Sequence, residues 1–92
     1  MNENELLIDD KRIYPIRTSR NYEDGIAALK EKTWEVLYLD WDMGQGCMNG
    51  FDVLYWLEKN KQHLPMRIEM LTLCDEKWAE MMEFARTLYV FK

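Results

Sequence analysis

Short apolar runs that end in acidic or hydroxyl residues alternate along this chain with segments of helical spacing. Leu6-Leu7-Ile8 is too short for a helix and is followed at once by two aspartates, a pattern typical of a buried strand. From residue 13 onward the alternation predicts βαβ units, a mainly parallel sheet and hence an α/β fold. Strands are predicted at residues 6–8, 13–17, 34–39 and 66–72, with 88–91 as a candidate fifth strand.

Three helices are predicted from capping residues and from the spacing of apolar side chains. Asn21 is expected to cap a helix over about residues 22–32, and Asn49 one over about residues 51–60. Asp75 is expected to cap the last helix. The inward stripe of that helix is predicted to consist of Trp78, Met81, Met82 and Ala85.

The charge balance argues against two classes of partner. The 92 residues carry 17 acidic and 12 basic side chains, a formal charge of -5, whereas non-specific binding to nucleic acid or to an anionic membrane needs a basic face. No apolar run approaches the ~20 residues that span a bilayer, and the first residues are acidic, unlike a secretory leader. We therefore expect one cytoplasmic domain over residues 1–92, with cations or basic protein surfaces as natural partners.

Acidic residues gather where two of the predicted strands end. Asp9 and Asp10 follow the first strand, and Asp40 and Asp42 follow the third. Ligands of open α/β sheets bind beyond the carboxyl ends of the strands. Converging carboxylates repel one another unless a cation compensates, and Mg²⁺ is the natural oxygen-preferring ion. The four aspartates therefore predict a magnesium site, although each alone is also a common turn former or helix cap.

A magnesium ion held there could bridge the carboxylates to a phosphate. The candidates for binding such a phosphorylated ligand are Arg12, Trp41, Thr72 and Lys92. The guanidinium of Arg12 can hold a phosphate in bidentate fashion, and the alternative is an ion pair with Asp10 or Asp42. The ring of Trp41 can stack on a base, and the alternative is a lid on the core. Thr72 ends the fourth predicted strand and Lys92 closes the chain, so both are donors at the same edge of the sheet.

These residues resemble the receiver domain of two-component response regulators. That family has an acidic pair after strand one, a phosphorylatable Asp after strand three, a Ser or Thr after strand four and a Lys after strand five. The residues that match these positions in order are Asp9, Asp10, Asp40, Thr72 and Lys92.

The closer resemblance is to a divergent branch, the cyclic-phosphate processing receiver-like domain, in which the first helix is lost. Its Asp-Asp-x-Arg start looks like residues 9–12, its Asp-His-Asp-Leu-Gly segment like residues 40–44, and its following helix like residues 50–58. The resemblance covers most of residues 6–85. It implies a three-layer sandwich of the flavodoxin-like type, with four or five strands in the order 2-1-3-4-5 and no first helix.

Two positions depart from the pattern of that branch. Trp41 stands where the family has a His, and Leu71-Thr72 stand where it has a His-Ser pair. The only histidine, His63, lies in the predicted loop before the fourth strand. Because imidazole is the side chain that best moves protons near neutral pH, the resemblance implies binding more readily than turnover.

Three functions from different classes follow. The first is a module that binds a phosphorylated or cyclic nucleotide through the acidic magnesium pocket and holds it unchanged, as a phage anti-immunity protein does when it sequesters a signal. The second is a Mg²⁺-dependent cyclic-phosphate hydrolase in which Asp40 is catalytic. The third is an acidic protein–protein interaction or inhibitor domain on a catalytically silent receiver scaffold. The sheet face bared by the lost helix also predicts a homodimer.

Overall fold

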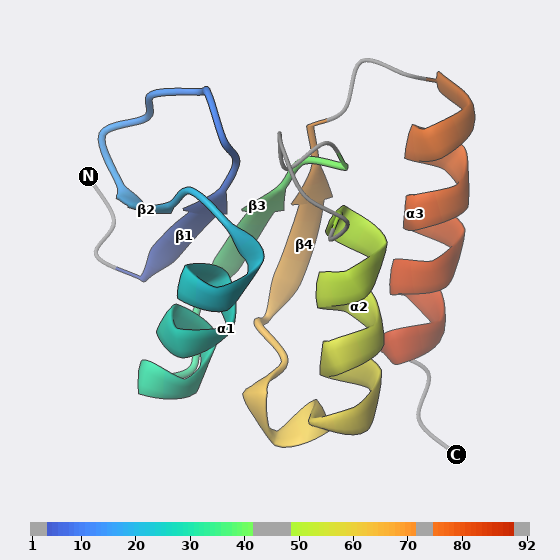
Figure 1. Ribbon diagram of the computed structural model, residues 1–92. Helices are drawn as coiled ribbons and strands as arrows, with labels where there is room; N and C mark the ends of the chain where they lie inside the picture. The colour runs from blue at the N-terminus through green and yellow to red at the C-terminus, as the bar shows by residue number, and fades with distance from the viewer. Residues whose placement is uncertain (1–3, 42–48, 72–74, 90–92) are drawn as a thin grey trace.

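In the computed structural model, which describes residues 4–41, 49–71 and 75–89, short strands alternate with helices (Figure 1). The strands are β1 (Glu5–Ile8), β2 (Arg17–Ser19), β3 (Val36–Leu39) and β4 (Arg67–Met70). The helices are α1 (Tyr22–Glu31), α2 (Gly50–Lys59) and α3 (Asp75–Leu88), with a short 3₁₀ turn, η1 (Lys61–His63), before β4.

The four strands form one parallel sheet in the order β2-β1-β3-β4. Leu6, Leu37 and Ile68 lie side by side across β1, β3 and β4. This order confirms the α/β receiver-like fold that the sequence predicts. Because all strands point the same way, the residues that follow β1, β3 and β4 meet at one edge of the sheet.

The core lies between one face of the sheet and the three helices. Side chains alternate between the two faces of a strand, so Leu6, Leu37 and Ile68 share the face toward the helices. They belong to the same buried cluster as residues of all three helices, among them Leu29, Leu54 and Met81. The described residues therefore form two layers, and the third layer of the expected sandwich is not among them.

The opposite face of the sheet is covered only over part of its width. Leu7 is fully buried there, and its neighbour across the pairing register is Tyr38 of β3. The ring of Tyr14 meets the Tyr38 ring edge-on, with centroids 5.8 Å apart. Farther along, Arg67 and Glu69 of β4 are exposed. The chain between β1 and β2 thus covers the β1 side of this face and leaves the β4 side open.

The connection between β1 and β2 runs over residues 9–16 without a helix. Parallel neighbours are normally joined by a dozen or more residues, usually including a helix, so the loss of the first helix is borne out. The strand predicted at residues 13–17 is wrong, because pairing with β1 begins only at Arg17. Ile13 is 86% exposed, and Pro15 has no N–H for a ladder hydrogen bond.

The predicted caps of α1 and α2 are confirmed. The Asn21 side chain accepts a hydrogen bond from the Asp24 N–H at 2.8 Å. Asn49 and Asp52 form a reciprocal capping box, in which the Asn49 N–H donates to Asp52 Oδ2 at 2.7 Å. Asp75, by contrast, is the first residue of α3 and not the residue before it.

The inward stripe of α3 differs from the predicted one at its N-terminal end. Met81 and Ala85 are buried as expected, and Leu88 extends the stripe. Trp78 is 46% exposed, so its assignment to the core is wrong. Leu88 also ends α3, which rules out a fifth strand starting at that residue, and residues 90–92 lie outside the described part of the chain.

Within the described residues, no helix has the length and apolarity needed to cross a membrane.

Candidate functional site

Three of the four predicted acidic ligands come together at the carboxyl edge of the sheet. Asp9, Asp10 and Asp40 each offer a carboxylate oxygen within 4.8 Å of the others. Main-chain hydrogen bonds fix two of them, because the Asp9 N–H donates to Ser19 O at 3.1 Å and the Asp40 N–H to Ile8 O at 3.2 Å. These bonds continue the ladders between the strands, so the sheet itself sets the distance between the two carboxylates.

Arg12 lies among these carboxylates and bridges three segments of the chain. Its Nη1 donates to Asp9 Oδ2 at 2.6 Å and lies 3.3 Å from Asp40 Oδ2. Its Nη2 donates to the main-chain oxygen of Leu71, just beyond β4, at 2.8 Å. The ion-pair alternative for Arg12 is therefore realised with Asp9 and Asp40. Among the described residues Asp10 makes no such pair with it, and Asp42 lies outside them. The Arg12 side chain is still 28% exposed.

The carboxylate of Asp9 is fully buried and every oxygen on it is engaged. Oδ1 accepts hydrogen bonds from the main-chain N–H groups of Lys11 at 2.8 Å and of Arg12 at 3.2 Å, while Oδ2 accepts from the guanidinium. Burial acts to raise the pKa of Asp9, but the hydrogen bonds and the charge of Arg12 outweigh it and lower that pKa. The hydrogen bond to Asp9 in turn raises the pKa of Arg12.

Arg20 stabilises the loop that follows β1, a role that sequence reasoning missed. Its Nη1 donates to the main-chain oxygens of Asp9 at 3.1 Å and Arg12 at 2.7 Å. It thereby fixes the turn that carries the aspartate and the arginine. The only sequence signal is its position directly after β2, on the same edge as the end of β1.

Trp41 follows Asp40 directly, and its partly buried side chain packs against the core. Its N–H donates to Asp40 Oδ1 at 2.8 Å, and its ring, which contacts the core, has Lys77 Nζ 5.4 Å from the ring centroid. The Trp41 main-chain oxygen accepts from the Gly50 N–H at 2.9 Å. This geometry favours the lid over the stacking platform, and it ties the end of β3 to the start of α2.

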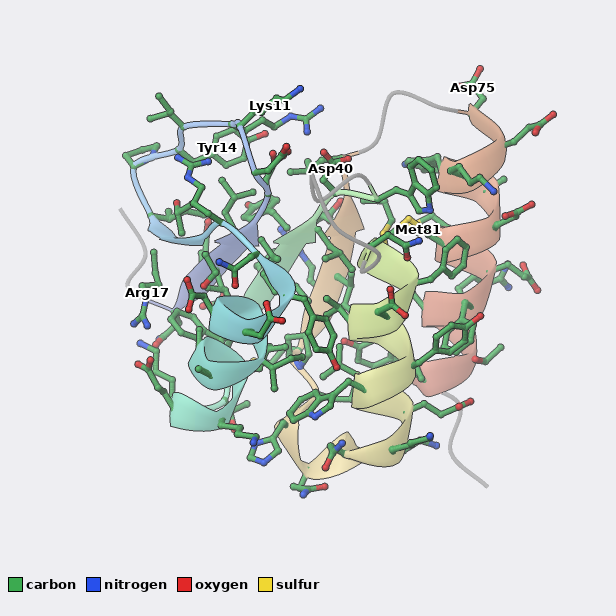
Figure 2. The ribbon with its side chains drawn as sticks, in the orientation of Figure 1. Lys11, Tyr14, Arg17, Asp40, Asp75 and Met81 are labelled. Carbon is green, nitrogen blue, oxygen red and sulfur yellow. The ribbon has the colours of Figure 1, made fainter. Side chains whose placement is uncertain are left out.

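Gly50 is required for that approach. A Cβ at this position would lie 2.5 Å from Asp40 O and 2.5 Å from Met81 Cε, which is too close for any side chain. Figure 2 shows Asp40 and Met81 at the end of the sheet that also carries the Lys11 loop, with Arg17 at a lower level. The glycine thus lets α2 begin directly against the residue that carries a site carboxylate.

The remaining predicted site residues, Asp42, Thr72 and Lys92, lie outside the described residues. The chain's single histidine, His63, stacks on Trp56 with ring centroids 5.5 Å apart, in the turn before β4. That turn precedes β4, whereas the carboxylates follow β1 and β3. No described imidazole therefore lies among the carboxylates.

The family model of the cyclic-phosphate processing receiver domain matches residues 4–87. This chain belongs to that family. Among solved structures, a mutant of the response regulator MaeR with bound sulfate is similar to this receiver domain, with a TM-score of 0.62 and 16% sequence identity. The match covers 95% of this chain and 99% of that one, and at this identity it supports the fold alone. A search of curated proteins finds no match.

The site of this receiver domain combines carboxylates with a guanidinium at the place where open α/β sheets bind ligands. Carboxylates are the ligands that Mg²⁺ prefers, and a guanidinium is the side chain that best matches a phosphoryl group. The donor set therefore has the chemistry for a hard cation, an anion, or both. The cation that the described residues place there is Arg12.

Proposed function

We propose that this receiver domain binds a phosphorylated ligand of the nucleotide or cyclic-nucleotide type and holds it unchanged. The observation that carries the proposal is the partly exposed guanidinium of Arg12, anchored by Asp9, Asp40 and the Leu71 oxygen at the ligand-binding edge. An anchored guanidinium is organised before the ligand arrives, so little side-chain entropy is lost when a phosphate binds.

The family supports the class of ligand. Its model is named for cyclic-phosphate processing. Carried over to this chain, that name points to a phosphoryl group as the part of the ligand that the site recognises. We propose Mg²⁺ at the carboxylates of Asp9, Asp10 and Asp40 as the cation that would bridge protein and phosphate. The fourth ligand predicted from the sequence, Asp42, lies outside the described residues.

Binding without turnover follows from the side chains at the two family histidine positions. Trp41 and Leu71 carry no group that can accept or donate a proton in catalysis. Such a module would lower the free concentration of a cyclic-phosphate signal, which is the role of a sequestering anti-immunity protein.

The test is an assay of ligand binding and ligand fate. The protein is incubated with 2′,3′-cyclic nucleotides, cyclic dinucleotides and ADP-ribose cyclic phosphate, with and without Mg²⁺. Bound and free ligand are separated by ultrafiltration and identified by mass spectrometry. We expect one class to be retained unchanged, and Arg12→Gln to lose about 1.5–3 kcal/mol of binding free energy, the usual worth of a hydrogen bond to a charged group.

Arg17→Gln is the matched control, because Arg17 makes a comparable bidentate pair with exposed Glu31 at the other end of the sheet. Equal loss in both variants would contradict the proposal. A chemically altered ligand would instead support the hydrolase, with Asp40→Asn expected to abolish turnover. If no ligand is retained, a basic protein surface becomes the expected partner.

A further inference from the structure

The three carboxylates of the site already have a cation of their own. Asp9, Asp10 and Asp40 converge within 4.8 Å, and Asp9 is fully buried while Asp40 is 9% exposed. Like charges at this distance and burial repel strongly unless a positive charge lies among them. Arg12 supplies that charge at 2.6 Å from Asp9 and 3.3 Å from Asp40.

The position of the Arg12 guanidinium overlaps the position that a divalent ion would need. Mg²⁺ binds carboxylate oxygens at about 2.0–2.1 Å, so an ion shared by Asp9 Oδ2 and Asp40 Oδ2 would lie between these two atoms. Nη1 of Arg12 occupies this region, since the same two oxygens are its nearest acidic neighbours. The other oxygen of Asp9 is held by two main-chain N–H groups.

Arg12 is also held in place from outside the cluster. Its Nη2 donates to Leu71 O, and its main-chain oxygen accepts from Arg20. These two contacts orient Arg12 so that its guanidinium pairs with the carboxylates in the arrangement that the structure shows.

We propose that Arg12 is the resident cation of this site and competes directly with divalent metal for Asp9 and Asp40. The inference deepens the proposed function, because it sets the condition under which Mg²⁺ can join the site. Divalent affinity is low while Arg12 pairs with the carboxylates. It rises when an anion, such as a ligand phosphate, draws the guanidinium away, so metal and anion bind cooperatively.

The first test uses Mg²⁺ alone and therefore does not depend on the phosphorylated ligand. Mg²⁺ binding is measured by isothermal titration calorimetry on the wild type, on Arg12→Gln and on the control Arg17→Gln. We expect Arg12→Gln to bind Mg²⁺ at least about tenfold more tightly, because the carboxylates lose their internal counter-ion. Wild type and control should bind equally weakly. Equal affinity in all three proteins would overturn the proposal.

A double variant locates the ion. Arg12→Gln combined with Asp40→Asn should lose the affinity that Arg12→Gln gained. If the double variant keeps that affinity, the ion binds elsewhere and the proposal fails.

Thermal unfolding followed by circular dichroism covers the case in which the variant folds poorly. Arg12→Gln leaves Asp9 buried without its partner, which destabilises a fold strongly. A cation that binds only the folded state raises its stability, so Mg²⁺ should raise the melting temperature of Arg12→Gln more than that of the wild type. An Arg12→Gln protein that Mg²⁺ neither refolds nor stabilises would overturn the proposal.

A wild-type protein that still retains a nucleotide would leave the proposed function intact after either negative result. A wild-type protein that retains no nucleotide, together with a clear gain of Mg²⁺ affinity in Arg12→Gln, would instead contradict the proposed function and leave this inference intact. The two proposals therefore fail separately.

Discussion

Asp9 is a fully buried residue whose carboxylate remains charged. Burial would raise its pKa, but the N–H groups of Lys11 and Arg12 and the guanidinium lower it below its ordinary value. A group whose pKa is lower in the folded state stabilises that state above its unfolded pKa of about 3.9, and the stabilisation is lost as the pH falls through the folded pKa.

We therefore expect the free energy of unfolding to fall as the pH is lowered below about 4. The measurement is urea unfolding at a series of acidic pH values for the wild type and for Asp9→Asn. The variant should be less stable at neutral pH and should lose less of its remaining stability in acid. Glu23→Gln, an exposed position on α1, serves as the control. Parallel pH curves for wild type and Asp9→Asn would contradict the assignment.

Some residues of the site could be predicted from the sequence and others could not. Asp9 and Asp40 follow strands that point the same way, so their convergence was predictable from the alternation of elements alone. The partner of Arg12 was not, because Asp9 and Asp10 both lie within three residues of it and only the turn geometry selects Asp9. Arg20 was missed because its contacts are to main-chain oxygens, which no side-chain pattern reveals.

At the scale of the elements, the junction between β3 and α2 leaves no room for a side chain at Gly50. A Cβ at Gly50 would meet Asp40 O at 2.5 Å, and a backbone atom cannot move aside without shifting the strand end. A Cβ at Gly25 in α1 would meet Ile8 Cδ1 at 2.7 Å, which is the far end of a flexible side chain.

We expect Gly50→Ala to destabilise the fold by about 1–3 kcal/mol, the usual cost of overpacking. Gly25→Ala should cost less, because Ile8 can adjust and alanine is about 1 kcal/mol better than glycine inside a helix. The free energies of unfolding of the two variants, measured in urea, test this order. If Gly50→Ala is as stable as Gly25→Ala, the junction between β3 and α2 can accommodate a Cβ and the prediction is wrong.

Elements with strong local signals were predictable, and those set by tertiary contacts were not. The caps at Asn21 and Asn49 are local hydrogen bonds, and both were found. β2 consists of Arg17, Thr18 and Ser19, which have no apolar pattern and are placed by pairing with β1. The β-branched residues just before it looked more like a strand, yet they form the connection.

At the scale of the whole molecule, the face of the sheet opposite the helices is open beside β4. Arg67 and Glu69 lie on this face with side chains 64% and 50% exposed, and within one chain Arg67 Nε lies 3.3 Å from Glu69 Oε1. In a two-fold arrangement each of these pairs within one chain would be exchanged for two pairs between copies, with Arg67 of each copy meeting Glu69 of the other. The homodimer stays a prediction, and we expect it to form on this face.

We expect light scattering after size exclusion to show a mass of two copies at high micromolar concentration. Arg67→Glu should shift the protein toward one copy, because like charges would then face each other across the two-fold axis. Arg86→Glu, an exposed change on α3, should leave the mass unchanged. A mass of one copy for the wild type at these concentrations would contradict the prediction.

The helix-free connection between β1 and β2 also bears on how the chain folds. Leu6 and Arg17, which face each other in the sheet, are eleven residues apart in sequence, whereas Leu6 and Leu37 are thirty-one apart. By the logarithmic dependence of closure entropy on length, the shorter loop is cheaper to close by about 0.9 kcal/mol.

Contacts between residues near in sequence form faster on average than distant ones. The β1–β2 pair is thus the first strand pairing the chain can reach, and its connection carries Asp9, Asp10 and Arg12. These three residues therefore lie in the loop that we expect to close first during folding. The rest of the site, Asp40 and the Leu71 oxygen, arrives only when β3 and β4 join the sheet.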